Sequence, residues 1–312
     1  MSRLLGSRSR RAGWVNLGGS DSGRRLDLAG IDFSDKSLDE MKKLLRKTLS
    51  NKINGICFSP YVGDQGPGDK ISPEQISERL DIIKDSTEWI RTFSCTDGNE
   101  EIPVIAKKKG LRVLCGAWLG KNREINEAEI NNAIRLANEG YADIVAVGNE
   151  VLLREDLTED ELIDYIKRVK EAVPKNVPVG YVDAYYEFGD HPRVSEVCDV
   201  ILANCYPFWE GCSLEDSFLY MKDMFRRALM AGRGKQVIIT ETGWPNKGSD
   251  VWGAVPSEEN AIKYFLNTYR WAEEEDIHIF YFSTFDEVWK LGHEGDVGAY
   301  WGLWDKDGEL KY

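Results

Sequence analysis

The sequence has little of what marks several broad classes of protein. Only three of its 312 residues are histidines, and no CxxC pair or Cys/His cluster has the spacing of a metal site. It contains no glycine-rich phosphate loop, and no apolar run approaches the roughly 18 residues that a membrane-spanning helix needs. The net charge of −13 opposes binding to nucleic acid or to an anionic membrane. We therefore expect no metal, no cofactor, no nucleic-acid partner and no insertion into a membrane.

A secretory signal is not recognisable at the N-terminus either. The first 25 residues contain six arginines and one acidic residue, Asp21, but no apolar stretch follows this basic start. We interpret residues 1–35 as a basic, flexible leader.

Cysteine usage bears on the cellular compartment. Most of the six cysteines lie within or just beyond apolar runs, where cysteine behaves as a small hydrophobic residue. Reduced thiols, and with them a cytoplasmic location, are the favoured interpretation. A secreted or periplasmic protein whose signal is missing from this chain is the alternative, and a disulfide that involves Cys198, Cys205 or Cys212 stays open.

Eight apolar runs of strand length recur along the chain, with helix-like segments between them. The runs lie near residues 54–60, 88–93, 111–118, 143–149, 178–183, 200–206, 236–241 and 278–284. The predicted helices are 73–84, 100–109, 126–138, 158–172, 215–231 and 257–275. The fifth and sixth runs are so close that a vestigial helix is expected between them. Near-continuous apolar strands that alternate with helices indicate an α/β fold, a (β/α)8 TIM barrel that forms one domain over residues 36–312.

One further helix is predicted before the first strand. Leu38, Met41, Leu44, Leu45 and Leu49 recur at helical spacing. We interpret this segment as an N-terminal capping helix that closes the bottom of the barrel, which is a packing role.

Two glutamates stand at the ends of buried strands. Glu150 follows the fourth apolar run, and Glu241 follows the seventh. A carboxylate in such a place is costly to desolvate and contributes no packing. Because the carboxyl ends of all barrel strands open onto one face, the pair predicts two catalytic carboxylates, with Asn149 placed to bond a sugar 2-hydroxyl. The alternative is that each glutamate only caps a helix or pairs with an arginine.

Four separated motifs make the prediction more specific. They are Ile90-Arg91-Thr92-Phe93, then Val147-Gly148-Asn149-Glu150 with Thr240-Glu241-Thr242-Gly243-Trp244-Pro245, then Asn204-Cys205-Tyr206-Pro207-Phe208, and a C-terminal stretch from Phe285 through Trp301-Gly302-Leu303-Trp304 to Tyr312. In order and spacing they resemble glycoside hydrolase family 17, the β-1,3-glucanase family of the large retaining (β/α)8 clan. The likeness covers roughly residues 54–312.

The resemblance implies roles for individual residues. Glu241 would be the nucleophile and Glu150 the general acid/base of a double displacement on laminarin-type β-1,3-glucan, with endo action expected and carboxyl groups about 5–5.5 Å apart. The two roles require a raised pKa for Glu150 and an ionised Glu241. Tyr206 would orient Glu241 through its hydroxyl, and Arg91 would belong to the substrate-binding residues.

The same resemblance covers a charged pair near the C-terminus. Glu287 and Lys290 are similar to the family's supporting pair beside the acid/base. Their alternative is a surface ion pair with no functional role.

Aromatic residues that follow strand ends are candidate platforms for sugar rings, because flat rings pack against the C–H faces of pyranoses. The candidates are Tyr61, Phe208, Trp209, Trp244 and Trp289. Core packing is the alternative for each of them.

The expected substrate is a β-glucan, but the two glutamates alone leave the reaction open. A β-1,3-glucan transglycosylase would use the same glycosyl-enzyme intermediate as a hydrolase. A non-catalytic β-glucan-binding barrel is an alternative of another class, and the intact glutamate pair argues against it.

Overall fold

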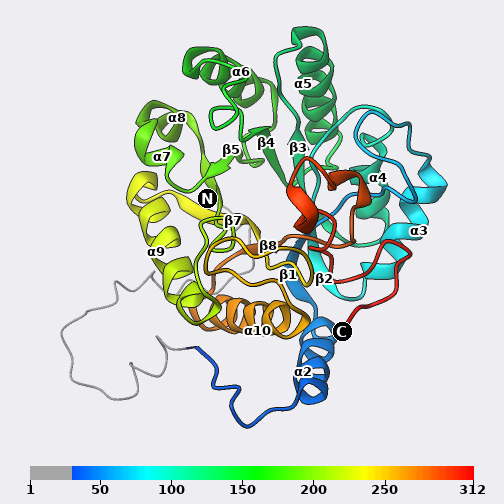
Figure 1. The fold of residues 1–312 in the computed structure, drawn as a ribbon. Helices are drawn as coiled ribbons and strands as arrows, with labels where there is room; N and C mark the ends of the chain where they lie inside the picture. The colour runs from blue at the N-terminus through cyan, green and yellow to red at the C-terminus, as the bar shows by residue number, and fades with distance from the viewer. Residues whose placement is uncertain (1–29) are drawn as a thin grey trace.

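The computed structural model describes residues 30–312, which form a closed barrel of eight parallel strands in sequential order (Figure 1). The strands are β1 (Ile53–Cys57), β2 (Thr87–Arg91), β3 (Arg112–Ala117), β4 (Ile144–Asn149), β5 (Val179–Ala184), β6 (Val200–Asn204), β7 (Gln236–Thr242) and β8 (Ile279–Tyr281). Pairing of β1 with β8 closes the barrel. Each strand overlaps its predicted run, so the prediction of a TIM barrel is confirmed.

Helices surround the barrel and connect successive strands (Figure 1). They are α3 (Pro73–Ile83), α4 (Glu101–Lys108), α5 (Arg123–Asn138), α6 (Glu159–Ala172), α7 (Glu187–Asp190), α8 (Pro192–Val197), α9 (Leu214–Gly232) and α10 (Glu258–Glu275). The short α7 and α8 occupy the connection where a vestigial helix was expected. A capping box begins α6, since the Thr158 hydroxyl accepts from the Glu161 amide and the Glu161 side chain accepts from the Thr158 amide. Two 3-10 turns, η1 (Val288–Lys290) and η2 (Gly295–Val297), follow β8.

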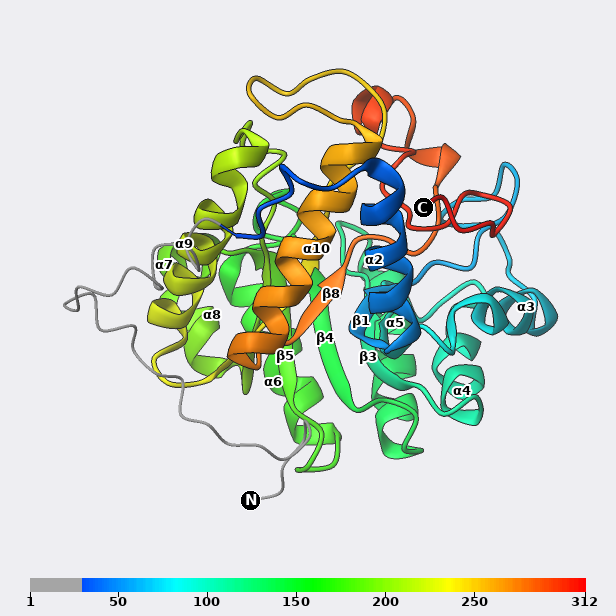
Figure 2. The same ribbon diagram turned by 90° about the horizontal axis from the view of Figure 1, so that it is seen from below.

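The helix before β1 does not close the bottom of the barrel, so that prediction is wrong. This helix, α2 (Leu38–Ser50), lies alongside α10 on the outside of the barrel (Figures 1 and 2). It occupies the place in the ring that a helix after β8 would take. Met41, Leu45 and Leu49 are buried, and the Arg46 Nε donates to the Tyr312 carbonyl at 2.6 Å. The apolar spacing identified a buried face but carried no information about the surface that this face covers.

The predicted leader falls mostly on residues 1–29, which lie outside the described residues. Its last part, residues 30–35, is described. The Ile31 amide donates to Asn267 Oδ1 on α10 at 2.7 Å, and Ile31 and Phe33 pack against the core.

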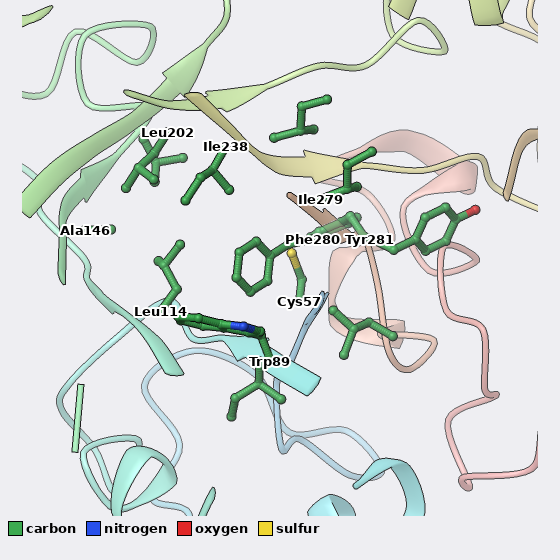
Figure 3. Close-up of a cluster of buried hydrophobic side chains, with 14 of the residues drawn as sticks. Cys57, Trp89, Leu114, Ala146, Leu202, Ile238, Ile279, Phe280 and Tyr281 are labelled. Atoms are coloured by element: carbon green, nitrogen blue, oxygen red, sulfur yellow. The ribbon is translucent and has the colours of Figure 1, made fainter. Parts of the chain in front are cut away.

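Apolar side chains fill the inside of the barrel. Figure 3 shows Trp89, Leu114 and Phe280 pointing toward one another from three strands, and all three are at most 2% exposed. Gly55 on β1 makes room for this packing, because a Cβ there would lie 2.7 Å from the Phe280 ring. The inside of the barrel is therefore a packed core and not a pore. In such a barrel a cleft is expected at the carboxyl ends of the strands, among the loops that follow them.

All six cysteines have free thiols, and five of them are buried. Burial raises the pKa of the Cys57 thiol to about 12. Within residues 30–312, no helix combines the length and the apolar character needed to cross a membrane.

Candidate active site

The two predicted glutamates lie at the same end of the barrel and share a hydrogen-bond donor. Glu241 is on β7, and Glu150 directly follows β4. The Asn204 Nδ2 on β6 donates to Glu150 Oε1 at 2.8 Å and to Glu241 Oε1 at 3.2 Å. The two oxygens therefore lie no farther apart than the sum of these bonds, about 6.0 Å.

The backbone around Glu150 is shaped to turn its side chain into the site. The pairing of β4 with β5 shifts register between Ala146 and Asn149, and Glu150 itself has a left-handed conformation, with φ of 51°. Its amide donates to the Val182 carbonyl at 2.8 Å, and its carbonyl accepts from the Arg154 amide at 2.9 Å. A non-glycine residue with positive φ costs free energy, so the surrounding bonds must hold it, as is common at functional sites.

Three side chains donate to the Glu241 carboxylate. Arg91 Nη1 lies 2.5 Å from Oε1, and the Tyr206 hydroxyl donates to Oε2 at 2.7 Å, in addition to Asn204. Arg91 also binds Asn149, whose Oδ1 accepts from the Arg91 Nη2 at 2.6 Å. Both Arg91 and Glu241 are buried. The guanidinium thus connects the residue before Glu150 to the carboxylate on β7.

The environment of Glu150 favours its protonated form. Burial is the main cause and the negative charge of Glu241 the second, and together they raise the pKa of Glu150 to about 7. The bond from Asn204 opposes this rise, while the charge of Asp183 adds to it. Burial also raises the pKa of Asp183, to about 6. Glu150 therefore carries a proton for part of the time at neutral pH, next to a Glu241 that is paired with a guanidinium.

Glu287 and Lys290 form a buried pair, so the alternative of a surface ion pair is wrong. Lys290 Nζ lies 2.9 Å from Glu287 Oε2, and the two side chains are each 7% exposed. The same Nζ sits 3.9 Å from the centre of the Phe282 ring, which lines the cleft described below. The Trp289 Nε1 donates to Glu287 Oε1 at 3.2 Å, and Trp289 makes an edge contact with Tyr61. These residues form one group beside the site.

A cleft of about 390 Å³ runs over the two glutamates. Its walls are Glu150, Leu153, Ala184, Tyr185, Tyr186, Asn204, Tyr206, Trp209, Glu210, Glu241, Phe282 and Glu294. Of the predicted aromatic platforms, only Trp209 lines it, with 37% of its surface exposed.

Two of the predicted platforms belong to the core instead. Phe208 and Trp244 are 0% and 1% exposed, and their ring centres lie 5.2 Å apart. The Trp244 Nε1 donates to the Val255 carbonyl at 3.0 Å. Since neither ring has a free face, the prediction that they bind sugar is wrong. A position just after a strand end does not tell which way a side chain points.

Several residues of the site were not predicted as site residues, although a signal for some was present. Asn204 and Asp183 are polar residues at the ends of the apolar strands β6 and β5, which is the same signal that identified the glutamates. Glu210 and Glu294 come from loops, where sequence alone gives no register. Among residues 30–312, no group of three or more His, Cys, Asp or Glu side chains has the arrangement of a metal site.

Comparisons with known proteins show which family the chain resembles. The BtgE/BtgC glycoside hydrolase domain family matches residues 55–302. The glucan 1,3-beta-glucosidase BGL2 of Candida albicans is 29% identical over 258 residues, which cover 75% of this chain and 83% of that protein. A putative glucan endo-1,3-beta-glucosidase of Aspergillus niger, btgC, is 27% identical over 321 residues, 90% of this chain and 46% of that protein.

A solved structure is also similar. It is a family 17 β-1,3-glucanosyltransferase from Rhizomucor miehei, with 28% identity and a TM-score of 0.74 over 84% of this chain and 96% of that one. An active-site mutant of the Rhizomucor miehei glucanosyltransferase has been solved with laminaritriose, with the same identity and TM-score to this chain.

Proposed function

The chain belongs to the BtgE/BtgC glycoside hydrolase domain family, and with it to glycoside hydrolase family 17, and from this premise we propose that it is a retaining enzyme that cleaves laminarin-type β-1,3-glucan. Two relatives carry names of glucan 1,3-beta-glucosidases, and the btgC name adds endo action. Endo cleavage by double displacement is the function that the site supports best.

In the first step, the Glu241 carboxylate attacks the anomeric carbon of the donor sugar. The glycosidic bond breaks as Glu150 gives its proton to the leaving oxygen, and a glycosyl ester forms on Glu241. In the second step, Glu150 takes a proton from water, whose oxygen attacks the same carbon and releases Glu241. Each step inverts the anomeric carbon, so the product keeps the β configuration.

One observation carries this proposal: the side-chain amide nitrogen of Asn204 donates to the carboxyl groups of both Glu150 and Glu241. The resulting limit of about 6.0 Å between the bonded oxygens is shorter than the roughly 6.5–9.5 Å that an inverting pair needs for a water between the groups. Carboxyl groups at this spacing suit direct attack on the sugar.

The surroundings of the pair support the division of roles. The raised pKa of Glu150 suits a residue that must hold a proton and then take it back. Arg91 and Tyr206 hold Glu241 by both oxygens, which orients it for attack. Because Arg91 also holds Asn149, it fixes the amide that we assign to the sugar 2-hydroxyl.

Transfer to a second glucan is the other candidate function. The Rhizomucor miehei relative is named a glucanosyltransferase, and it covers most of this chain. Transfer differs from hydrolysis only in the second step, where a sugar hydroxyl replaces water. Tyr185, Tyr186 and Trp209 line the cleft together with the proton donor Glu150, and this aromatic lining suits an acceptor sugar.

A time course with reduced laminari-oligosaccharides of defined length tests the proposal. The wild type should give shorter products that retain the β anomer when first formed. Products longer than the starting chain would favour transfer, and oligosaccharides that stay intact would leave only the non-catalytic glucan-binding barrel.

Variants separate the two glutamates in the same assay. Glu241→Gln should abolish turnover of every substrate. Glu150→Gln should abolish cleavage of oligosaccharides but still release an activated phenol from an aryl β-laminaribioside, since that leaving group needs no proton. Glu196→Gln, on an exposed side chain of α8, is the matched control and should behave as the wild type. Normal turnover by Glu241→Gln would refute its role as the nucleophile.

A further inference from the structure

Trp252 is a conspicuous residue that the proposed mechanism does not use. It is 85% exposed, the highest value among the exposed large hydrophobic residues of the described chain. It belongs to the connection between β7 and α10, which projects from the same end of the barrel as the segment after β8 (Figure 2). The exposed indole therefore offers a flat apolar face to a ligand at this end of the barrel.

The connection that carries Trp252 is held by specific contacts. Val251 and Ala254 form a β-bridge on either side of it. The Val255 carbonyl accepts from Trp244 Nε1 at 3.0 Å and from Asn260 Nδ2 at 2.9 Å. The loop therefore presents Trp252 in a defined position, which lowers the entropy cost of binding a ligand there.

The base of the Trp252 side chain rests on the backbone of Gly211. A Cβ at Gly211 would lie 2.4 Å from the indole Cε3, so only glycine leaves room for the ring. The Gly253 amide also donates to the Gly211 carbonyl at 3.0 Å. Gly211 directly follows Trp209 and Glu210, which both line the cleft. Trp252 is thus seated next to the wall of the cleft.

This part of the cleft contacts the strand next to the one that leads to the proton donor. Glu210 accepts a hydrogen bond from the Tyr220 hydroxyl, which lies 3.5 Å from the hydroxyl of Tyr185 at the end of β5. β5 is the direct neighbour of β4, whose end carries Glu150. In the proposed reaction the leaving chain, and later the acceptor, lies next to Glu150, while the donor sugar is bonded to Glu241.

We propose that Trp252 is a stacking platform for a distal glucose unit of the leaving or accepting β-1,3-glucan chain, beyond the sugar positions that Trp209 and Glu210 border. The inference rests on the proposed function and extends it, because it assigns a specificity for longer chains. It also gives the exposed indole a ligand whose apolar C–H face matches a flat ring.

Steady-state kinetics over a series of laminari-oligosaccharides tests the platform. In Trp252→Ala, kcat/KM should fall about two- to tenfold for long substrates and stay unchanged for the shortest one that the wild type cleaves. Trp252→Phe should restore most of the loss. Met230→Ala removes another exposed apolar side chain, 62% exposed on α9, and should change nothing at any length.

Reducing-end-labelled substrates test which side of the cleft is involved. Loss of a site on the leaving side should move the cut toward the reducing end and shorten the labelled product. A shift in the other direction, an equal loss at every chain length, or no loss at all would overturn the inference. The proposed function fails separately, if the wild type cleaves none of the series.

Discussion

Arg91→Lys is the most informative perturbation of the site, because it keeps the positive charge and removes the guanidinium, whose two terminal nitrogens bind different partners. In the wild type, one guanidinium holds Glu241 Oε1 at 2.5 Å and Asn149 Oδ1 at 2.6 Å. A lysine has one nitrogen in a compact head group and cannot reproduce both contacts in this geometry. We expect the lysine to stay with the Glu241 carboxylate and to release Asn149.

The size of the effect follows from the contact that is lost. A hydrogen bond to a charged group contributes about 1.5–3 kcal/mol. If the contact of Asn149 with the sugar 2-hydroxyl forms mainly in the transition state, kcat should fall roughly ten- to hundredfold with little change in KM. The free energy of unfolding should fall by a similar 1.5–3 kcal/mol, because Arg91 is 1% exposed and its partners stay buried.

Oligosaccharide kinetics and urea unfolding measure the two quantities. Arg112→Lys is the matched control: Arg112 is also a strand arginine next to an aromatic ring, but its pair with Glu88 is 3.4 Å long and exposed. That variant should change neither quantity. An Arg91→Lys enzyme with wild-type kcat would refute the idea that the guanidinium positions Asn149 for the reaction.

Three further predictions concern the same site and the core. The basic limb of the pH profile of kcat/KM should fall near pH 7, where Glu150 loses its proton. Asp183→Asn should move that limb to lower pH, because it removes a negative charge that raises the pKa of Glu150. A limb that does not move would contradict this. The folded state binds the Glu150 proton more tightly than the unfolded state does, with a pKa of about 7 against 4.5. The contribution of this group to stability is therefore complete below pH 4.5 and is lost as pH rises through 7. The difference in melting temperature between pH 5.5 and pH 8 should be smaller in Glu150→Gln than in the wild type. Trp244→Ala should lower the free energy of unfolding by about 3–5 kcal/mol, because the ring is buried. Trp209→Ala should lower turnover with little change in the free energy of unfolding. The reverse pattern would contradict the assignment of Trp244 to the core and of Trp209 to the cleft.

The strands and the position of the glutamate pair were predictable because one physical rule covers both. A strand inside a barrel is apolar along its whole length, so Glu150 and Glu241 stand out at the ends of β4 and β7. The same rule extends to Asn204, the last residue of β6, and to Asp183, the last but one of β5. Amides at strand ends carry the same signal as carboxylates, and the amide of Asn204 is the donor that links the two glutamates.

Other features depend on which way a side chain points or which surface a helix covers, and the sequence pattern does not specify either. Phe208 and Trp209 are adjacent, yet one ring is fully buried and the other lines the cleft, because successive residues of a loop point to different sides. The amphipathic pattern of α2 predicted its buried face but not its place beside α10. The burial of Glu287 and Lys290 depends on how the segment after β8 folds over Phe282.

Trapping the covalent intermediate tests the central claim most directly. Glu150→Gln would be incubated with a 2-deoxy-2-fluoro laminaribiosyl fluoride, whose leaving group needs no proton and whose fluorine slows the second step, and its intact mass and peptides would then be measured. The assignment of Glu241 as the nucleophile predicts one glycosyl group per chain, bonded to the peptide that contains Glu241, and no adduct in the double variant with Glu241→Gln. A chain that cleaves glucan but forms its adduct on another residue, or forms none, would contradict the assignment.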